Sequence, residues 1–326
     1  MKYWDVEERL PVGPIEWPNG ARLAVLVAFD YQSEVGDWTL PNGDPHYGQI
    51  TEWSYSGRVA IWRLLDSLER HGVKATFNTC GMTAELYPES CQEIVAAGHE
   101  IAGHTYSHRW QWELSEDEER HEEVRKTIDA IGEVTGERIV GWRSPSVQPS
   151  PNTLRILVEE GFKWDGNFLN YDLPYMLDVP GTGSLVEVPY TFSTDDFPFI
   201  YGTPIQQYGG FPGPRQTMAN LYQILKDEFD VLYAESATSP RMFKYQNHPT
   251  VVGRAHRSIY FDRFLEYMKG HDGVWFARID EVADWWLSHY DKPQDQAAAL
   301  RTLGFASSQR AGERTSSGSA GKTEKG

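Results

Sequence analysis

The 326-residue sequence contains two cysteines, Cys80 and Cys91. Two cysteines are too few for a disulfide scaffold, and neither has a second cysteine at the spacing of a metal or redox site. We therefore interpret both as structural residues.

Long apolar runs are also absent. No stretch reaches the ~20 apolar residues that cross a bilayer. The first residues, MKYWDVEERLPVGP, lack the basic segment followed by an apolar one that marks a secretion signal. We therefore expect a cytoplasmic protein with no membrane partner.

Positive charge is scarce. Lysine and arginine number 30 against 47 aspartates and glutamates, which gives a formal net charge of −17. Such a surface repels nucleic acid and anionic membranes. The sequence therefore predicts no nucleic-acid partner and favours a neutral or zwitterionic small-molecule substrate.

The body of the chain has the pattern of an α/β protein. Short β-branched or aromatic runs alternate with segments of helical period, as in βα units around a parallel sheet. We expect strands at 23–30, 75–80, 99–104, 139–144, 163–168, 185–190, 241–248 and 273–279. Helices are expected at 57–72, 115–136, 150–161, 214–235 and 258–269. In the first of these helices, one apolar stripe is expected to contain Val59, Ile61, Trp62, Leu64, Leu65 and Leu68.

No internal repeat or linker divides this body, so we expect one domain over 21–292, preceded by an N-terminal extension at 1–20. Residues 307–326 have no aromatic or aliphatic residue beyond alanine, which predicts a disordered tail. Residues 33–56 and 191–214 are rich in Gly, Pro, Asp and Tyr, and we expect them to be long loops that cover a functional site.

Reactive side chains lie in or at the ends of several expected strands. In a parallel barrel the active site is at the carboxyl ends of the strands. The residues in question are Asp30, His104, Arg143, Asp165 and His248. Packing alone does not account for five such coincidences.

Together these motifs resemble the polysaccharide deacetylase family over roughly residues 20 to 290. The motifs are FDYQSE (29–34), HTYSH (104–108), GWRSPS (141–146), GFKWDGNF (161–168) and HPTVVGRAHR (248–257). The sequence is most similar to a cytoplasmic branch that includes peptidoglycan deacetylase-like proteins, cyclic imidases and metal-independent allantoinases. The resemblance implies a distorted (β/α) barrel that hydrolyses non-peptide carbon–nitrogen bonds.

The resemblance also implies a metal site. His104 and His108 match the family's HxxxH ligands, and neutral imidazole is a good ligand for Zn²⁺. In this branch the third ligand is an aspartate, but the matching residue here is Gln32. Losing that carboxylate weakens a metal site. Either the amide oxygen of Gln32 is the third ligand, or Glu34 approaches the ion, or no metal is tightly bound.

Further roles follow from the same resemblance. Asp30 matches the general base, Arg143 the arginine that orients it, and His248 the general acid that protonates the leaving nitrogen. Asp165 is expected either to tune that histidine or to form a structural turn. Trp142 could stack on a ring of the substrate, although most tryptophans belong to the core.

Three interpretations remain open from the sequence. The first is a metal-dependent hydrolase of a small amide, imide or ureide. The second is a metal-independent, allantoinase-like hydrolase in which the histidines grip the substrate, and the third is a ligand-binding barrel that has lost its metal. The aromatic residues of the two long loops, among them Trp38, Trp53, Phe197 and Tyr208, further predict a homo-oligomer, which the resemblance suggests is a tetramer.

Overall fold

The computed structural model describes residues 6–36, 43–201, 216–291, 296–305 and 307–311. Within them, ten strands form one sheet. They are β1 (Glu7–Arg9), β2 (Leu23–Tyr31), β3 (Thr76–Thr79), β4 (Glu100–Gly103), β5 (Gly141–Trp142), β6 (Trp164–Asp165), β7 (Tyr175–Val179), β8 (Gly183–Glu187), β9 (Arg241–Asn247) and β10 (Val274–Ala277).

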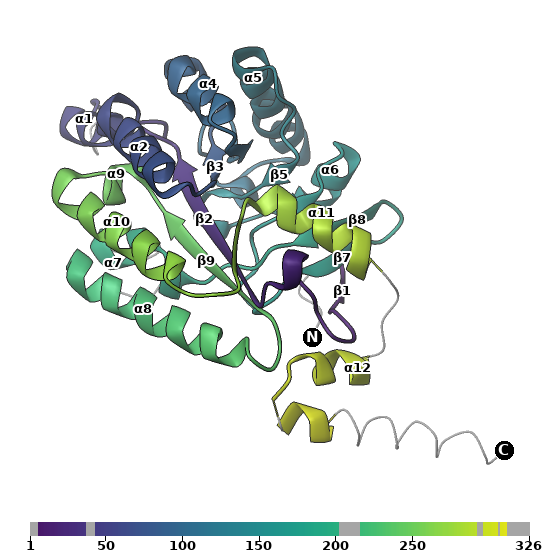
Figure 1. Cartoon of the computed structure of the whole chain (residues 1–326). Helices are drawn as coiled ribbons and strands as arrows, with labels where there is room; N and C mark the ends of the chain where they lie inside the picture. Colours follow the sequence, from purple (N-terminus) through teal and green to yellow (C-terminus); the bar gives the residue numbers. More distant parts are fainter. Residues whose placement is uncertain (1–5, 37–42, 202–215, 292–295, 306, 312–326) are drawn as a thin grey trace.

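Helices surround this sheet (Figure 1). They are α1 (Tyr47–Tyr55), α2 (Ile61–His71), α3 (Gly81–Leu86), α4 (Pro88–Ala96), α5 (Lys126–Thr135), α6 (Thr153–Glu159), α7 (Asp196–Ile200), α8 (Met218–Glu235), α9 (Pro249–Val252), α10 (Ala255–Lys269), α11 (Ile279–Tyr290) and α12 (Gln296–Thr302). Two π-helical segments, η2 (Ser56–Ala60) and η4 (Glu118–Arg125), lead into α2 and α5. Among the described residues, no helix is both long and apolar enough to span a membrane.

Strand β2 is the centre of the sheet, and all nine of its residues are buried. It pairs in parallel with β3, β9 and β10. Alternate side chains of a strand face opposite sides. The bulky ones, such as Val25 and Phe29, pack in the larger hydrophobic cluster with residues of the outer helices, whereas Ala24 and Ala28 lie in the smaller one. Asp30 shares the face of these alanines, so the alternation directs it into the barrel.

The barrel is not closed by a continuous ladder. Seven strand pairs are parallel, but no pairing joins β8 to β9 within the described residues. An isolated bridge between Asp195 and Gln246 connects the segment after β8 to β9. Across the same gap, the Nζ of Lys244 donates to the carbonyl of Val188 at 3.2 Å, and Thr194 Oγ1 donates to the carbonyl of Lys244 at 2.6 Å. We call this gap between β8 and β9 the seam. The fold is the distorted β/α barrel that the sequence predicted.

Each of the eight expected strands contains an observed strand, but two strands were not expected. These are β1 and β7, which are antiparallel to their neighbours: β1 pairs with β7, and β7 with β8. The N-terminal extension therefore continues the sheet, and its Ile15 and Trp17 are buried in the core. At the other end, residues 307–311 are helical, so the expected disordered tail does not begin at 307. Residues 312–326 lie outside the described residues.

The apolar stripe predicted for 57–72 is wrong at two positions. Ile61, Leu64 and Leu68 are buried, but Val59 is 40% exposed and Trp62 is 41% exposed. The π-helical segment η2 covers residues 56–60, and its wider turn shifts the residues that face the core. Gly72 ends α2 in the left-handed conformation, as glycine permits.

Candidate active site

A cavity of about 110 Å³ opens at the carboxyl ends of the parallel strands. Its walls are formed by Asp30, Gln32, Trp53, His104, His108, Arg143, Ser146, Tyr190, Phe192, Asp195, Phe197, Pro198 and His248. Six of the nine site residues predicted from the sequence are among them. The structure thus brings the expected base, arginine, acid and candidate ligands into one site.

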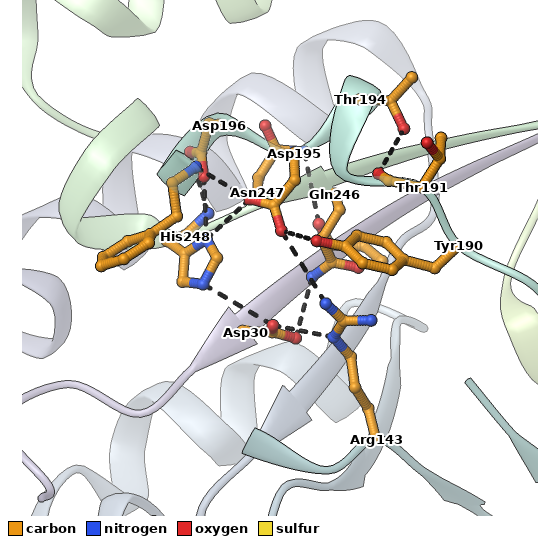
Figure 2. A network of polar contacts seen from close by, with 12 residues as sticks. Asp30, Arg143, Tyr190, Thr191, Thr194, Asp195, Asp196, Gln246, Asn247 and His248 are labelled. Carbon is orange, nitrogen blue, oxygen red and sulfur yellow. Dashed lines mark hydrogen bonds and ion pairs between the residues drawn. The ribbon is translucent and has the colours of Figure 1, made fainter. Parts of the chain in front are cut away.

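Asp30 is held by three donors. Its Oδ2 accepts from Arg143 Nε at 2.9 Å, and its Oδ1 accepts from Gln246 Nε2 at 2.9 Å (Figure 2). The same Oδ1 also accepts from Asn78 Nδ2 at 2.8 Å. Burial alone would raise the pKa of Asp30, but the neighbouring cations, above all Arg143, hold it well below the usual range. Asp30 is therefore ionised at neutral pH, as a general base must be.

Arg143 is fixed as firmly as the carboxylate it orients. Its side chain is 3% exposed, and it donates from Nη1 to the carbonyl of Gly166 at 3.1 Å. The guanidinium also lies over the ring of Tyr190, 4.0 Å from the ring centroid. A buried arginine with these contacts cannot swing away from Asp30. The predicted orienting role agrees with this geometry.

His248 is oriented by a second carboxylate. Its Nδ1 lies 2.8 Å from Asp196 Oδ1, and its backbone N–H donates to Asp196 Oδ2 at 3.0 Å (Figure 2). Burial alone would lower the pKa of His248, but Asp195 and Asp196 raise it to about 9. The imidazole is therefore protonated at neutral pH. Its Nε2 lies 3.7 Å from Asp30 Oδ2, so a charged acid faces a charged base.

Asp195 and Asp196 were not predicted from the sequence. They belong to the stretch TDDF within the loop expected at 191–214, where two adjacent aspartates carry no periodic signal. The structure gives them the role that had been considered for Asp165. They reach His248 because the Asp195–Gln246 bridge places the loop beside β9 across the seam. The tuning role expected for Asp165 is therefore wrong.

His104 and His108 line the same cavity as Asp30 and His248. Thr105 and His108 have φ of 60° and 61°, so HTYSH is a tight loop and not a helical turn. The ring centroids of the two histidines are 5.2 Å apart. Burial lowers the pKa of His104 to about 4, and burial together with His104 lowers the pKa of His108 to about 3. Both imidazoles are neutral at pH 7, the form that binds a metal or a substrate oxygen.

The side chains of His104, His108 and Gln32 fit a divalent metal. His104 Nδ1 lies 2.7 Å from the carbonyl of Arg143, which leaves Nε2 available. Gln32 lines the same cavity, and its Oε1 is buried without a hydrogen-bond partner among the described residues. An orphaned buried acceptor beside two neutral imidazoles is suited to a cation. The three donors carry no negative charge, so they would hold an ion more weakly than a set with a carboxylate.

A second group has the spacing of metal ligands: Asp195, Asp196 and His248 have one donor atom each within 4.8 Å of the others. All four carboxylate oxygens of this group, however, already have partners. Asp195 accepts from the N–H of Phe197 and the hydroxyl of Tyr190, and Asp196 faces the backbone N–H and the Nδ1 of His248. A metal would have to displace these bonds. We interpret the group as a hydrogen-bonded support for the acid.

The other three predicted site residues do not line the cavity. Trp142 is fully buried and packs edge-on against Phe162, so it belongs to the core. Glu34 accepts from the hydroxyl of Tyr87 with both oxygens, at 2.8 and 2.9 Å. Asp165 pairs in register with Trp142, is fully buried, and accepts from Asn167 Nδ2 at 2.7 Å. The aromatic walls of the cavity come instead from residues of the two long loops: Trp53, Tyr190, Phe192 and Phe197.

Known proteins resemble this chain both in sequence and in fold. The family described as "Polysaccharide deacetylase" matches residues 54–164. A peptidoglycan deacetylase of Helicobacter pylori is 27% identical over 80% of this chain and 95% of its own length. The crystal structure of PuuE allantoinase is 28% identical, covers 86% of this chain and 96% of its own, and gives a TM-score of 0.76.

A third relative decides the assignment. The crystal structure of a "probable polysaccharide deacetylase" from Pseudomonas aeruginosa PAO1 is 31% identical, with a TM-score of 0.73. The alignment covers 85% of this chain and 95% of that protein. The resemblance stated from the sequence motifs is confirmed. This chain belongs to the polysaccharide deacetylase family.

Proposed function

We propose that the protein hydrolyses the carbon–nitrogen bond of a small amide, imide or ureide. The protein is a deacetylase-like hydrolase of non-peptide carbon–nitrogen bonds, in keeping with the names of its relatives. The observation that supports the chemistry is the pair formed by Asp30 and His248. Their facing atoms are 3.7 Å apart, with the carboxylate ionised and the imidazole protonated at neutral pH.

This pair performs the two proton transfers of amide hydrolysis. Asp30 accepts a proton from the attacking water as its oxygen forms a bond to the carbonyl carbon. His248 then gives its proton to the nitrogen as the carbon–nitrogen bond of the tetrahedral intermediate breaks. Before the reaction Arg143 keeps Asp30 ionised and Asp196 keeps His248 protonated. After the carbon–nitrogen bond breaks both groups are neutral, and transfer of the proton from Asp30 to His248 restores the starting charges.

His104, His108 and Gln32 would hold a divalent metal, and we propose zinc. When bound, such an ion supplies Lewis acidity towards the carbonyl oxygen and the water. A metal-independent hydrolase is the second candidate, because Gln32 carries no charge where the related branch has an aspartate. In that case His108 donates a hydrogen bond to the carbonyl oxygen, whereas His104, whose Nδ1–H is bonded to the carbonyl of Arg143, accepts one from a substrate N–H through Nε2. A barrel that only binds ligand is disfavoured, because Asp30 and His248 are in place with their partners.

The cavity supports a small, flat substrate. An apolar cavity of ~150 Å³ accepts a molecule of the size of benzene, and the cavity here is about 110 Å³. The ring of Phe197 is tilted against that of His248, with centroids 5.0 Å apart, and the centroid of Trp53 lies 5.8 Å from that of Phe197. These aromatic walls suit a planar amide or a five- or six-membered ring. We therefore propose a cytoplasmic small molecule as the substrate, in preference to a long glycan.

Metal analysis coupled to a hydrolysis screen tests this proposal. The full chain is purified without chelator, its metal content is measured, and release of ammonia or a carboxylate is followed for acetamides, cyclic imides and ureides. Turnover that is lost with a chelator and restored by Zn²⁺ supports the metal-dependent form. Turnover of metal-free protein supports the second candidate. Binding without turnover of any of these compounds would reject the proposal.

A further inference from the structure

A second cavity, of about 140 Å³, opens on the seam. Its wall includes residues that follow β8, such as Tyr190 and Thr194, and residues of β9, such as Lys244. Tyr190 is common to this cavity and the active site, so the two cavities are neighbours. The missing β8–β9 pairing creates the opening. We call this space the seam cavity.

The buried end of the seam cavity presents unused donors. Lys244 is 5% exposed, and among the described residues its Nζ has one hydrogen-bond acceptor, the carbonyl of Val188. An ammonium group has three N–H donors. The hydroxyl of Tyr171 also lines the cavity, and this atom is buried with no hydrogen-bond partner among the described residues. Because an unmade buried hydrogen bond is costly, this end is suited to an anionic oxygen.

The mouth of the seam cavity has the opposite character. Asp172 is exposed and Glu228 is half-buried, and both line the cavity. Burial and the charge of Asp172 raise the pKa of Glu228. Two carboxylates that repel each other gain from a cation placed between them. The cavity is therefore cation-attracting at its mouth and donor-rich at its buried end.

We propose that the seam cavity binds a small zwitterion that carries a carboxylate and an ammonium group, as an amino acid does. The carboxylate is bound by Lys244 and Tyr171, and the ammonium group by Glu228 and Asp172. A cavity of ~150 Å³ takes about six non-hydrogen atoms, the size of benzene. Alanine and β-alanine have that size. This site is separate from the hydrolytic one, and its occupancy does not depend on the proposed function.

Other charges around Lys244 favour an anion there. Burial, followed by the charge of Arg143, lowers the pKa of Lys244 to about 7. The charges of Glu187, Asp30 and Asp165 act in the other direction. Asp30 is ionised but pairs with Arg143, and burial raises the pKa of both Glu187 and Asp165. They therefore neutralise the lysine only in part. A ligand carboxylate in the cavity neutralises the remaining positive charge of Lys244.

Calorimetric titration of the full chain tests the proposal at constant ionic strength. The probes are glycine, L-alanine and β-alanine as zwitterions, propionate as the carboxylate alone, and ethylamine as the amine alone. We expect saturable binding of at least one zwitterion and weaker binding of the two single-charge probes. The absence of saturable binding by every zwitterion up to about ten millimolar, where a millimolar site would be nearly filled, would overturn the proposal.

Two variants and a matched control sharpen the test. Tyr171→Phe removes a hydroxyl that has no partner in the protein, so it should leave folding intact and weaken zwitterion binding about tenfold or more. Tyr222→Phe makes the same change outside the cavity and should leave the affinity unaltered. Glu228→Gln should weaken zwitterion binding and strengthen propionate binding, because it removes an attraction for the one and a repulsion for the other. Equal affinities for all four proteins would exclude this site.

Discussion

His248 and Asp30 are tuned in opposite directions by their neighbours. The pKa of the histidine is raised to about 9 and that of the carboxylate is held below its usual range. An acid and a base with such values are both in the working form over a wide interval of pH. Each value depends on identifiable partners, so substitutions of those partners provide direct tests.

Asp196→Asn should shift the alkaline limb of the pH–rate profile. The change removes the negative charge that faces His248 Nδ1, and we expect the pKa of His248 to fall from about 9 towards its ordinary value of ~6.5. Activity above neutrality then drops first. The measurement is kcat/KM against pH, with NMR titration of the imidazole. Asp284→Asn, which alters a surface ion pair with Lys163, is the control and should leave the profile unchanged.

His248 also makes the stability of the protein depend on pH. Because its pKa is raised in the folded state, its contribution is fully present below ~6.5 and is lost as pH rises through about 9. We expect this contribution to be of order 1–3 kcal/mol. Urea unfolding of the parent and of His248→Gln, compared between pH 6 and 9.5, isolates it from other buried groups. A difference in unfolding free energy that is constant over this range would contradict the assignment.

Gln32→Asp should strengthen metal binding. The substitution adds a carboxylate to two neutral imidazoles, and charge is the component this donor set lacks. Titration calorimetry with Zn²⁺ should show an affinity at least tenfold higher than that of the parent. Gln32→Ala, which removes the oxygen, is the matched control and should bind less tightly. Equal affinity of the three proteins would remove Gln32 from the metal site.

At the scale of elements, the seam controls where the acid lies. Asp195 and Asp196 follow β8, and their segment is tied to β9 by the hydroxyl of Thr194, the Asp195–Gln246 bridge and the bonds of His248 (Figure 2). Within the described residues, no strand ladder joins this segment to β9. Loss of one hydrogen bond at the seam should therefore move the Asp196 carboxylate away from the His248 imidazole. Such a change should affect catalysis more than folding.

Thr194→Val tests this dependence. The variant keeps the shape of the side chain and loses the 2.6 Å bond to the carbonyl of Lys244. We expect a loss of ~1–2 kcal/mol in unfolding free energy and a several-fold fall in kcat. Thr135→Val removes a comparable hydroxyl bond, to Ile131 in α5, far from the cavity. Thr135→Val should lose stability but keep its kcat. An equal fall in kcat in both variants would show that the seam has no special role.

How far the sequence predicts the molecule also differs between elements. The apolar run of β2 predicts a buried strand, and the reactive residues at the ends of β2 and β9 predict the site. Strand β1 has three residues, EER, without apolar character, so it cannot be found by pattern. Asp195 and Asp196 join the site through contacts with a strand some fifty positions later in the chain, which no local signal encodes.

Strand alternation alone places Trp142 in the core and not in the site. Trp142 and Arg143 are neighbours at the end of a strand, and neighbours on a strand point to opposite faces. Since Arg143 reaches Asp30 inside the barrel, Trp142 has to face the helices, where it packs in the core. The same alternation explains why Gln32 shares the cavity with Asp30. Strand period therefore contains more information about this site than residue type does.

At the scale of the whole molecule, several large apolar side chains are exposed along the helical stretch 47–71. Tyr47 is 72% exposed, Trp62 is 41% exposed and Val59 is 40% exposed, all within α1, η2 and α2. Helix α1 also carries Trp53, a wall of the cavity. Grouped exposed apolar residues of this kind are typical of subunit interfaces. We propose that this surface contributes to a homotetramer.

Light scattering tests the assembly. The chain of 37.2 kDa should elute with about four times that mass at micromolar concentration. Trp62→Glu should lower the mass by placing a charge in the interface. Leu86→Glu is the control, since Leu86 is 51% exposed on another helix, α3, and its substitution should leave the mass unchanged. A monomeric parent protein would contradict the proposed assembly.

The central claim is that Asp30 and His248 hydrolyse a carbon–nitrogen bond. Its most direct test is the turnover of the best substrate from the amide, imide and ureide screen by the parent and by Asp30→Asn. Asparagine preserves the shape of the side chain and removes the base. We predict a fall in kcat of ~10²–10⁴. The variant should also lose stability, because Arg143 is left buried without its carboxylate, so the turnover is compared at a temperature where circular dichroism shows both proteins folded. Activity of the variant within a factor of about three of the parent would contradict the account.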